Sequence, residues 1–402
     1  MTSSGSIAVS PAESLPARRP DRTRWTTLLF YSAGHFAVDV YSAALGVFQP
    51  LLAAQRGVTL SQAGMLGGMM VFAGSVLQPL WGILSDRFHS RLFSVLAPLV
   101  AAVFISSLGM ATSFPVMLLL VFLGASGVAS FHPQASARAA ADMTGSRGKA
   151  MAIFISAGSL GFALGPTYFS LLLGKIGLDR GYLAAIPGVL VTVALLAVLH
   201  PKEATAEQRR QSMDWAPILA VLRPLLLLYM LVFLRSTVQI SFTQFLPLYL
   251  TRERGFSYES ASFALSMFSS MGAIGGFSGG FLADRFGGHR VIQASLIGAI
   301  PPLLLFFATD GALAMIGLAL AGLILLSTTP INVVMAQRLA PGQSGTVSAL
   351  MMGGSWGMAG MILLPLAGVF AERFTLHHVL ASFALFPLLG FLLSLRLKKE
   401  PS

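Results

Sequence analysis

Two ionisable side chains lie four residues apart inside the first long apolar stretch of the sequence. His35 and Asp39 occur within residues 25–53, where most other side chains are hydrophobic. A spacing of four residues places both on one face of a helix. An ionisable group at the centre of an apolar span costs at least about 2.5–3.5 kcal/mol, so it usually faces a cavity or a partner. We expect this pair to handle a proton, with a purely structural role as the alternative.

Further polar side chains recur inside later apolar stretches. Arg235 and Gln239 repeat the four-residue spacing within residues 218–250, at nearly the depth of Asp39. Because an unpaired charge at that depth is costly, we expect Asp39 and Arg235 to face one another or to share a substrate or water. Proline loosens a helix, so a structural kink is the alternative for two polar residues beside prolines. These last members of the predicted cavity are His132, which precedes Pro133, and Asn332, which follows Thr329-Pro330.

Charged residues also gather in two short loops that share the pattern Gly-x-x-x-Asp-Arg. A carboxylate in such a loop can accept hydrogen bonds from a helix N-terminus and can pair with arginine. Such pairs can form when two helix bundles meet and break when they part, so we expect a gating role. The alternative is a positively charged anchor at the membrane surface. The residues are Asp86, Arg87 and Arg91 in the first loop, and Asp284, Arg285 and Arg290 in the second.

A glycine-rich segment within residues 150–173 is expected to pack closely against another helix. Gly158, Gly161 and Gly165-Pro166 are spaced like the small residues that let membrane helices approach one another. Ordinary tight packing explains this motif as well as a functional role does.

Several chemistries are excluded by what the sequence lacks. The chain has no cysteine, so it has no disulfide, thiol nucleophile or thiolate metal site. It contains no metalloprotease, nucleophile-elbow or phosphate-binding glycine motif, which argues against an enzyme. We predict no metal site and no cofactor, because no carboxylate or thiolate ligands accompany His289, His377 and His378 in a metal-binding pattern.

The elements that must position these residues are membrane-spanning helices. Hydrophobic residues make up 55% of the 402 residues and charged residues only 10%, where a soluble domain carries about 25%. A single soluble globule is therefore excluded. A span needs roughly 20 apolar residues, which predicts twelve spans at residues 25–53, 61–84, 92–110, 115–137, 150–173, 182–199, 218–250, 259–282, 291–308, 312–337, 345–370 and 377–395.

The distribution of charge predicts how these spans are oriented and grouped. Most Lys and Arg residues fall on the side of the N-terminus, so the positive-inside rule places both termini in the cytoplasm. The net charge of +11 then reflects topology and not nucleic acid binding, which needs basic residues gathered on a folded face. The predicted parts are a disordered cytoplasmic tail (1–24), an N-terminal six-helix bundle (25–199), a cytoplasmic linker (200–216), a C-terminal six-helix bundle (217–395) and a cytoplasmic tail (396–402).

The two halves repeat one another in sequence. Three matches occur in the same order, which predicts two bundles related by a parallel repeat and a substrate site at the midplane between them. Gly82-Ile-Leu-Ser-Asp86-Arg87 recurs as Gly280-Phe-Leu-Ala-Asp284-Arg285, Ser130-Phe-His-Pro133 as Ser327-Thr-Thr-Pro330, and Gly158-Ser-Leu-Gly161 as Gly354-Ser-Trp-Gly357.

With its loop pattern after the second and eighth spans, the chain from about residue 25 to 395 resembles a transporter of the major facilitator superfamily. It resembles in particular the fosmidomycin-resistance subfamily of drug efflux proteins, and this resemblance implies that the glycine run is the exporter-type motif of the fifth span. The chain departs from the pattern at Gln134, where the subfamily usually has an acid, and at Leu120 and Leu123, where many exporters carry an arginine. The motifs are His35-Phe36-x-x-Asp39, Gln78-Pro79-Leu-x-Gly82, Phe131-His132-Pro133 and the run from Gly158 to Pro166.

Together these features predict an all-α membrane protein of the inner membrane that acts as a secondary active transporter. We expect efflux of a small drug-like or anionic compound, fosmidomycin-like by resemblance, by alternating access. No ATP site is present, and buried histidine and carboxylate groups titrate near physiological pH, so a proton gradient is the expected energy source. The expected partners are a small-molecule substrate, protons and the lipid bilayer, with the chain monomeric. Proton-coupled uptake of a small organic acid, a membrane-embedded enzyme and a transport-fold sensor are the alternatives.

Overall fold

The computed structural model describes residues 21–88, 90–139, 143, 147–199 and 216–397. All regular elements within these ranges are helices. The predicted linker lies outside them except for Ala216, as do residues 1–20 and 398–402 of the two predicted tails. The first helix begins at Asp21, inside the segment predicted as the N-terminal tail.

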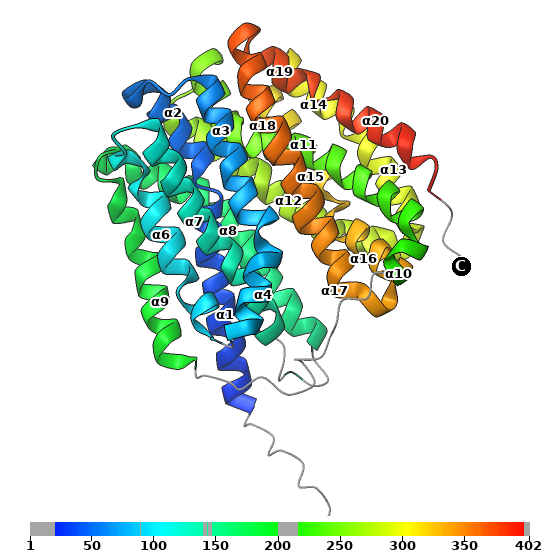
Figure 1. Ribbon diagram of the computed structural model, residues 1–402. Coiled ribbons are helices and arrows are strands. Elements are labelled where there is room, and N and C mark those ends of the chain that lie inside the picture. The colour runs from blue at the N-terminus through cyan, green and yellow to red at the C-terminus, as the bar shows by residue number, and fades with distance from the viewer. Residues whose placement is uncertain (1–20, 89, 140–142, 144–146, 200–215, 398–402) are drawn as a thin grey trace, which may run out of the picture.

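The N-terminal half holds the α-helices α1 to α9, most of which are labelled in Figure 1. They are α1 (Asp21–Ser42), α2 (Leu45–Arg56), α3 (Leu60–Val71), α4 (Gln78–Phe88), α5 (Leu92–Val95), α6 (Ala97–Ser106), α7 (Phe114–Ala139), α8 (Arg147–Ile176) and α9 (Ile186–Val198). A π-helical turn, η1 (Phe72–Val76), joins α3 to α4, and 3-10 turns follow α6 (η2, Ser107–Met110) and precede α9 (η3, Gly181–Ala185).

The C-terminal half also consists of short and long α-helices. They are α10 (Ala216–Ala220), α11 (Leu222–Glu253), α12 (Tyr258–Phe286), α13 (Gly288–Gly298), α14 (Ile300–Ala308), α15 (Gly311–Leu326), α16 (Thr329–Leu339), α17 (Ser344–Ala349), α18 (Trp356–Arg373), α19 (Leu376–Ser382) and α20 (Leu385–Ser394). A 3-10 turn, η5 (Pro341–Gln343), precedes α17, and a second π-helical turn, η6 (Leu350–Ser355), joins α17 to α18.

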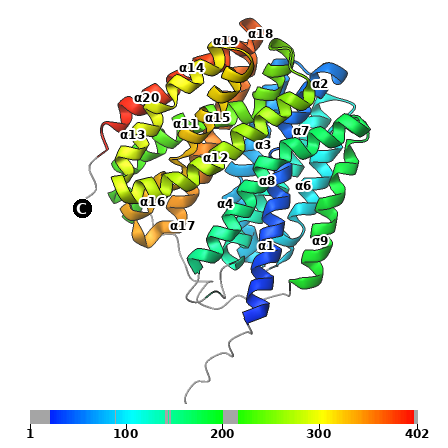
Figure 2. The ribbon, with the colours of Figure 1, turned by 180° about the vertical axis from the view of Figure 1, so that it is seen from behind.

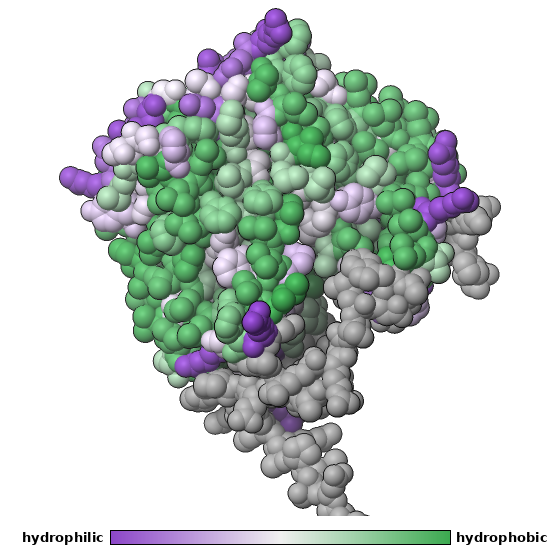
Figure 3. Space-filling model, in the orientation of Figure 1, coloured by the Kyte–Doolittle hydropathy of each residue, from purple (hydrophilic) through white to green (hydrophobic). Residues whose placement is uncertain are grey.

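Eleven stretches of the described chain are long and apolar enough to cross a membrane, and they match eleven of the predicted spans. Hydrophobic side chains cover most of the side of the molecule in Figure 3, as expected for a surface that faces lipid. The predicted eighth span is α12, a 29-residue helix that occupies the expected place between α11 and α13. Its many serines and glycines lower its hydropathy, so it has the length of a span without the apolar character of the others.

The two polar residues that precede a proline, in His132-Pro133 and Thr329-Pro330, lie in different helical settings in the two halves. Pro133 lies inside α7, which continues without a break from Phe114 to Ala139. In the second half α15 ends at Leu326 and α16 begins at Thr329, with Pro330 in the first turn of the new helix. Proline is tolerated in a first turn because its missing N–H has no helical partner there. Only the second pair therefore interrupts its span.

The two halves meet at one end of the molecule, which we call the closed end. Figures 1 and 2 both show the bundles in contact near α2, α3 and α18 and spreading apart toward α4 and α17. Hydrogen bonds that join the halves lie toward the closed end: Thr167 Oγ1 donates to Ser266 Oγ (2.8 Å), and Ser61 N donates to Glu372 Oε1 (2.9 Å). Gly46 of α2 lies against the backbone of α11, where a Cβ atom would be 2.0 Å from the carbonyl oxygen of Thr243. We call the opposite end, which carries the two Asp-Arg loops, the loop end.

Candidate functional site

Three titratable side chains come together between α1 and α7, and we call them the central triad. His35 and Asp39 lie on α1, with His35 Nε2 3.4 Å from Asp39 Oδ2. His132 lies on α7, with its Nε2 atom 3.7 Å from Asp39 Oδ1. The three side chains place one donor atom each within 4.8 Å of one another. They are therefore close enough to share a single cation, either a proton or a metal ion.

The helix α8 packs against two members of the triad, His35 and Asp39. The Nδ1 atom of His35 is 2.8 Å from the carbonyl oxygen of Phe154, and the two rings stack with centroids 4.2 Å apart. A Cβ atom at Gly158 would lie 2.4 Å from His35 Nε2 and 2.7 Å from Asp39 Oδ2. Farther along α8, Gly161 and Gly165 lie against the backbone of α1. Small residues on α8 thus allow the close approach that holds the triad together.

The triad is not sealed from solvent. The side chains of Asp39 and His132 retain 16% and 25% of their accessible surface, whereas His35 retains 11%. Asp39 is near the middle of the span from Arg24 to Arg56. The partly accessible triad therefore lies near the middle of its span.

A second polar group, the Arg235 cluster, lies in the C-terminal half. The guanidinium of Arg235 donates to Gln239 Oε1 (2.7 Å), Thr329 Oγ1 (3.1 Å) and Ser236 Oγ (3.0 Å). The residue is 3% exposed, and its Nε atom is buried without a hydrogen-bond partner. All three acceptors are neutral, so they leave the positive charge of the guanidinium uncompensated.

The direct pairing expected between Asp39 and Arg235 is not present in this conformation. Within the described ranges no ion pair joins them, because Asp39 faces two imidazoles of its own half and Arg235 bonds to residues of the other. Asn332 is also buried in the C-terminal half, where its Nδ2 donates to the carbonyl of Thr328 (3.1 Å) and its Oδ1 has no partner. A substrate or water shared between the halves remains a prediction.

The residues of the two Asp-Arg loops lie at the loop end. Arg87, Asp284, Arg285 and Arg290 are exposed, and Arg91 is partly buried. Asp86 lies in α4, but its side chain falls outside the described residues. Asp284 makes no ion pair with any described residue, and the guanidinium of Arg285 lies 5.3 Å from the ring centre of Phe286. The gating role of these residues stays a prediction.

Gln134, noted in the sequence only as a departure from the subfamily pattern, makes four hydrogen bonds. Its Oε1 accepts from the backbone N (3.2 Å) and the hydroxyl (2.5 Å) of Ser94. Its Nε2 donates to Ser85 Oγ and to the Ser90 carbonyl, both at 2.9 Å. Sequence reasoning missed these contacts, since they need the fold of the loop after α4.

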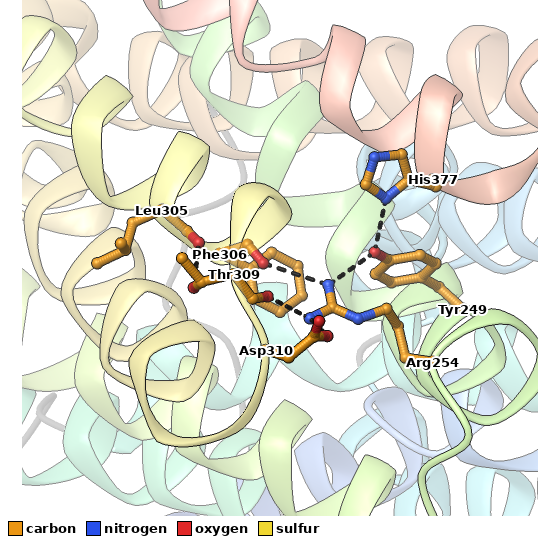
Figure 4. A network of polar contacts seen from close by, with 7 residues as sticks. All are labelled: Tyr249, Arg254, Leu305, Phe306, Thr309, Asp310 and His377. Atoms are coloured by element: carbon orange, nitrogen blue, oxygen red, sulfur yellow. Dashed lines mark hydrogen bonds and ion pairs between the residues drawn. The ribbon is translucent and has the colours of Figure 1, made fainter.

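A groove of about 930 Å³ marks the closed end, with walls from both halves. One wall contains residues 57–60 and the other contains Arg252, Glu372 and His378. Beside it, Arg254 donates to Tyr249 Oη (3.0 Å) and to Asp310 Oδ1 (2.5 Å), and Tyr249 Oη lies 2.9 Å from His377 Nδ1 (Figure 4). This network ties the end of α11 to α19 and to the turn before α15. No sequence pattern indicated it.

Comparison with known proteins agrees with this architecture. Residues 31–355 match the family model described as Major Facilitator Superfamily. The chain is 28% identical over 382 residues to the fosmidomycin resistance protein of Escherichia coli (strain K12), covering 92% of each chain. It is also 28% identical over 392 residues to the MFS-type transporter YfnC of Bacillus subtilis (strain 168), covering 95% of each.

A solved structure shows the same fold. The chain resembles a bacterial homolog of the human lysosomal transporter Spinster, crystallised in an inward-facing and unoccupied conformation, with a TM-score of 0.79. The match covers 94% of this chain and 98% of that one at 16% sequence identity.

Proposed function

This chain belongs to the Major Facilitator Superfamily, and from this premise we propose that it exports a small drug-like or anionic compound in exchange for protons. The central triad is the proton site, and the Arg235 cluster contacts the substrate. The protein spans the inner membrane as a monomer with both termini in the cytoplasm, so that the loop end faces the cytoplasm. It works by alternating access, without a cofactor.

The geometry of the central triad carries this proposal. A carbonyl oxygen only accepts, so the contact between His35 and Phe154 requires a proton on Nδ1 of His35. In neutral His35 the Nε2 atom is then an acceptor, and it faces Asp39 Oδ2, which is also an acceptor when ionised. Two facing acceptors become a favourable contact only when a proton lies between them. The second oxygen of Asp39 faces His132 Nε2, so the carboxylate can receive or pass a proton on either side.

The arrangement of the halves supports alternating access. Hydrogen bonds join them at the closed end, while the bundles spread toward the loop end (Figure 1). In the proposed orientation this is an inward-facing state, with the triad open to cytoplasmic protons. Protonation removes a buried charge from mid-span and so biases the equilibrium between the two states of the transporter.

The Arg235 cluster supports an anionic substrate group. A buried guanidinium with neutral partners and an Nε–H that has no partner is costly unless an anion completes its coordination. Carboxylates and phosphonates match the planar fork of arginine. Efflux is supported by the similarity to the fosmidomycin resistance protein and by the glycine run on α8.

Transport in proteoliposomes with an imposed pH gradient tests the proposal. Fosmidomycin is the first probe, followed by a panel of small carboxylates and phosphonates. We expect Asp39→Asn to abolish pH-driven transport while still allowing exchange of the probe down its own gradient. Asp179→Asn is the matched control, because its exposed ion pair with Arg56 at the closed end contributes little.

Two outcomes would contradict the proposal. Full pH-driven transport by Asp39→Asn would remove the triad from the coupling mechanism. Loss of transport on addition of a chelator would show that the shared cation is a metal ion and not a proton. The direction of the pH gradient that drives accumulation of the probe distinguishes efflux from proton-coupled uptake of an organic acid.

A further inference from the structure

Gln134 is an extensively hydrogen-bonded side chain near the loop end. It lies on α7, is 7% exposed, and uses both acceptor positions of its oxygen and both N–H groups of its nitrogen. Its partners are the serines at positions 85, 90 and 94. One side chain thus holds the end of α4, the connecting loop and the start of α5.

The residues held in this way surround the first Asp-Arg loop. Ser85 directly precedes Asp86, and Ser90 and Ser94 lie on either side of Arg91. Ser130, one turn earlier on α7, adds a hydrogen bond from its hydroxyl to the carbonyl of Phe93 (3.1 Å). Movement of α7 along its axis therefore moves the loop.

The same stretch of α7 also contacts the central triad. His132 comes two residues before Gln134, and its Nε2 atom lies 3.7 Å from Asp39. Between them Pro133 lies against α4, where a Cβ atom at Gly82 would be 3.6 Å from the proline ring. Three consecutive residues thus contact the triad, the helix α4 and the loop after it.

We infer that Gln134 is a positioning residue that couples the protonation of the central triad to the position of the Asp86–Arg91 loop. This inference rests on the proposed function, since it takes the triad as the proton site. When protonation changes the contact between Asp39 and His132, α7 shifts, and Gln134 transmits the shift to the loop. The Gln134 amide is neutral at every pH, so any pH dependence of the loop position originates at the triad and not at Gln134.

An ionised carboxylate could not make all the contacts of this amide. Glutamate at position 134 would still accept from Ser94, but its second oxygen would face the carbonyl oxygen of Ser90. Two acceptors at that distance repel, and the Ser90 carbonyl loses a buried partner. Gln134→Glu therefore releases the loop with almost no change in side-chain volume. Its matched control is Gln337→Glu on α16, where the amide Nε2 donates to Ser348 Oγ (2.7 Å).

The absence of native cysteines gives a direct readout that needs no substrate. Phe88 lies within the loop and is 63% exposed, so Phe88→Cys introduces a single accessible thiol. Its reaction with a membrane-impermeant maleimide is measured on the full chain between about pH 5.5 and pH 8.5, a range in which histidine changes its charge. Each rate is divided by the rate for free cysteine at the same pH.

The charged groups in this readout are few. Asp39 and His35 on α1 and His132 on α7 face one another, while α8 contributes only the carbonyl of Phe154 and Gly158. The loop sequence contains Asp86, Arg87 and Arg91, and also His89, a histidine that can change its charge in this range, so every chain of the series carries His89→Gln as well.

We expect the normalised labelling rate of the Phe88→Cys chain to change about threefold across this range, as for a modest population shift. Adding Gln134→Glu should abolish the change, whereas adding Gln337→Glu should preserve it. Adding Asp39→Asn should also abolish it. If Asp39→Asn loses the pH dependence and Gln134→Glu keeps it, the coupling role of Gln134 is wrong, while the assignment of the central triad as the proton site is supported. If Asp39→Asn keeps it, the proton site itself is wrong.

Discussion

Gly158 on α8 lies directly against His35 on α1, with no room for a side chain between them. A Cβ atom at Gly158 would be 2.4 Å from the Nε2 atom of His35. The glycine therefore does more than let two helices pack, because its missing side chain leaves the space in which His35 faces Asp39.

This relationship predicts that Gly158→Ala impairs proton coupling. The added methyl group forces His35 or α8 to move, at a cost of about 1–3 kcal/mol for overpacking. We expect pH-driven transport to fall about tenfold, the equivalent of 1.4 kcal/mol. Gly276→Ala on α12 is the control, because its nearest atoms lie at an ordinary 3.7 Å. Equal transport by the two variants would show that His35 does not need this space.

Arg235→Ala is predicted to weaken binding of anionic substrates more than that of neutral ones. The substitution removes the charge-assisted contacts between the guanidinium and the anionic group of the substrate. Such contacts are roughly twice as strong as neutral hydrogen bonds. We expect the Kd of a carboxylate or phosphonate substrate to rise at least about tenfold. Calorimetric titration of the purified protein measures this, with the exposed Arg373→Ala as the control. A uniform loss for charged and neutral substrates would point to a structural role for Arg235.

Asp86→Asn and Asp284→Asn are predicted to slow transport while leaving substrate binding largely intact. Both residues lie in the Asp-Arg loops at the loop end, so we expect their loss to affect closure of the gate and not the cavity. Each variant should shift the protein toward its inward-open state. Rates in proteoliposomes, together with equilibrium binding, separate the two effects, and parallel losses of rate and binding would contradict the gating role.

Ser266→Ala is predicted to loosen the closed end. The hydroxyl of Ser266 accepts from both the backbone N (3.1 Å) and the hydroxyl (2.8 Å) of Thr167 across the two halves. Removing a hydrogen bond costs about 0.5–1.5 kcal/mol, which should raise labelling of a cysteine buried at this seam about two- to tenfold. Thr243→Cys supplies that thiol. Ser278→Ala on the same helix is the control, because its hydroxyl bonds only to its own helix at Ile274; an equal increase there would refute the prediction.

Much of the fold follows from the sequence, because lipid leaves a backbone few options other than apolar helices of fixed length. The span at 92–110, for example, was predicted with the residues that the structure shows. The i, i+4 spacing placed His35 beside Asp39, since neighbours on one helix share a face.

Contacts between helices were harder to predict. The depth of Arg235 suggested Asp39 as a partner, but its long side chain reaches Thr329 and Ser236 within its own half instead. The approach of His132 to Asp39 depends on how α7 crosses α1, and the bonds of Gln134 depend on a loop conformation. Neither of these is encoded in a periodicity.

The groove at the closed end has a consequence for pharmacology. Because its walls come from both halves, its shape lasts only while the halves are joined there. An antibody fragment or macrocycle selected to fill it would recognise one conformer and oppose the rearrangement that opens this face. In the proposed orientation such a molecule acts from the periplasm. It would be a non-competitive inhibitor that never enters the membrane and is never itself exported.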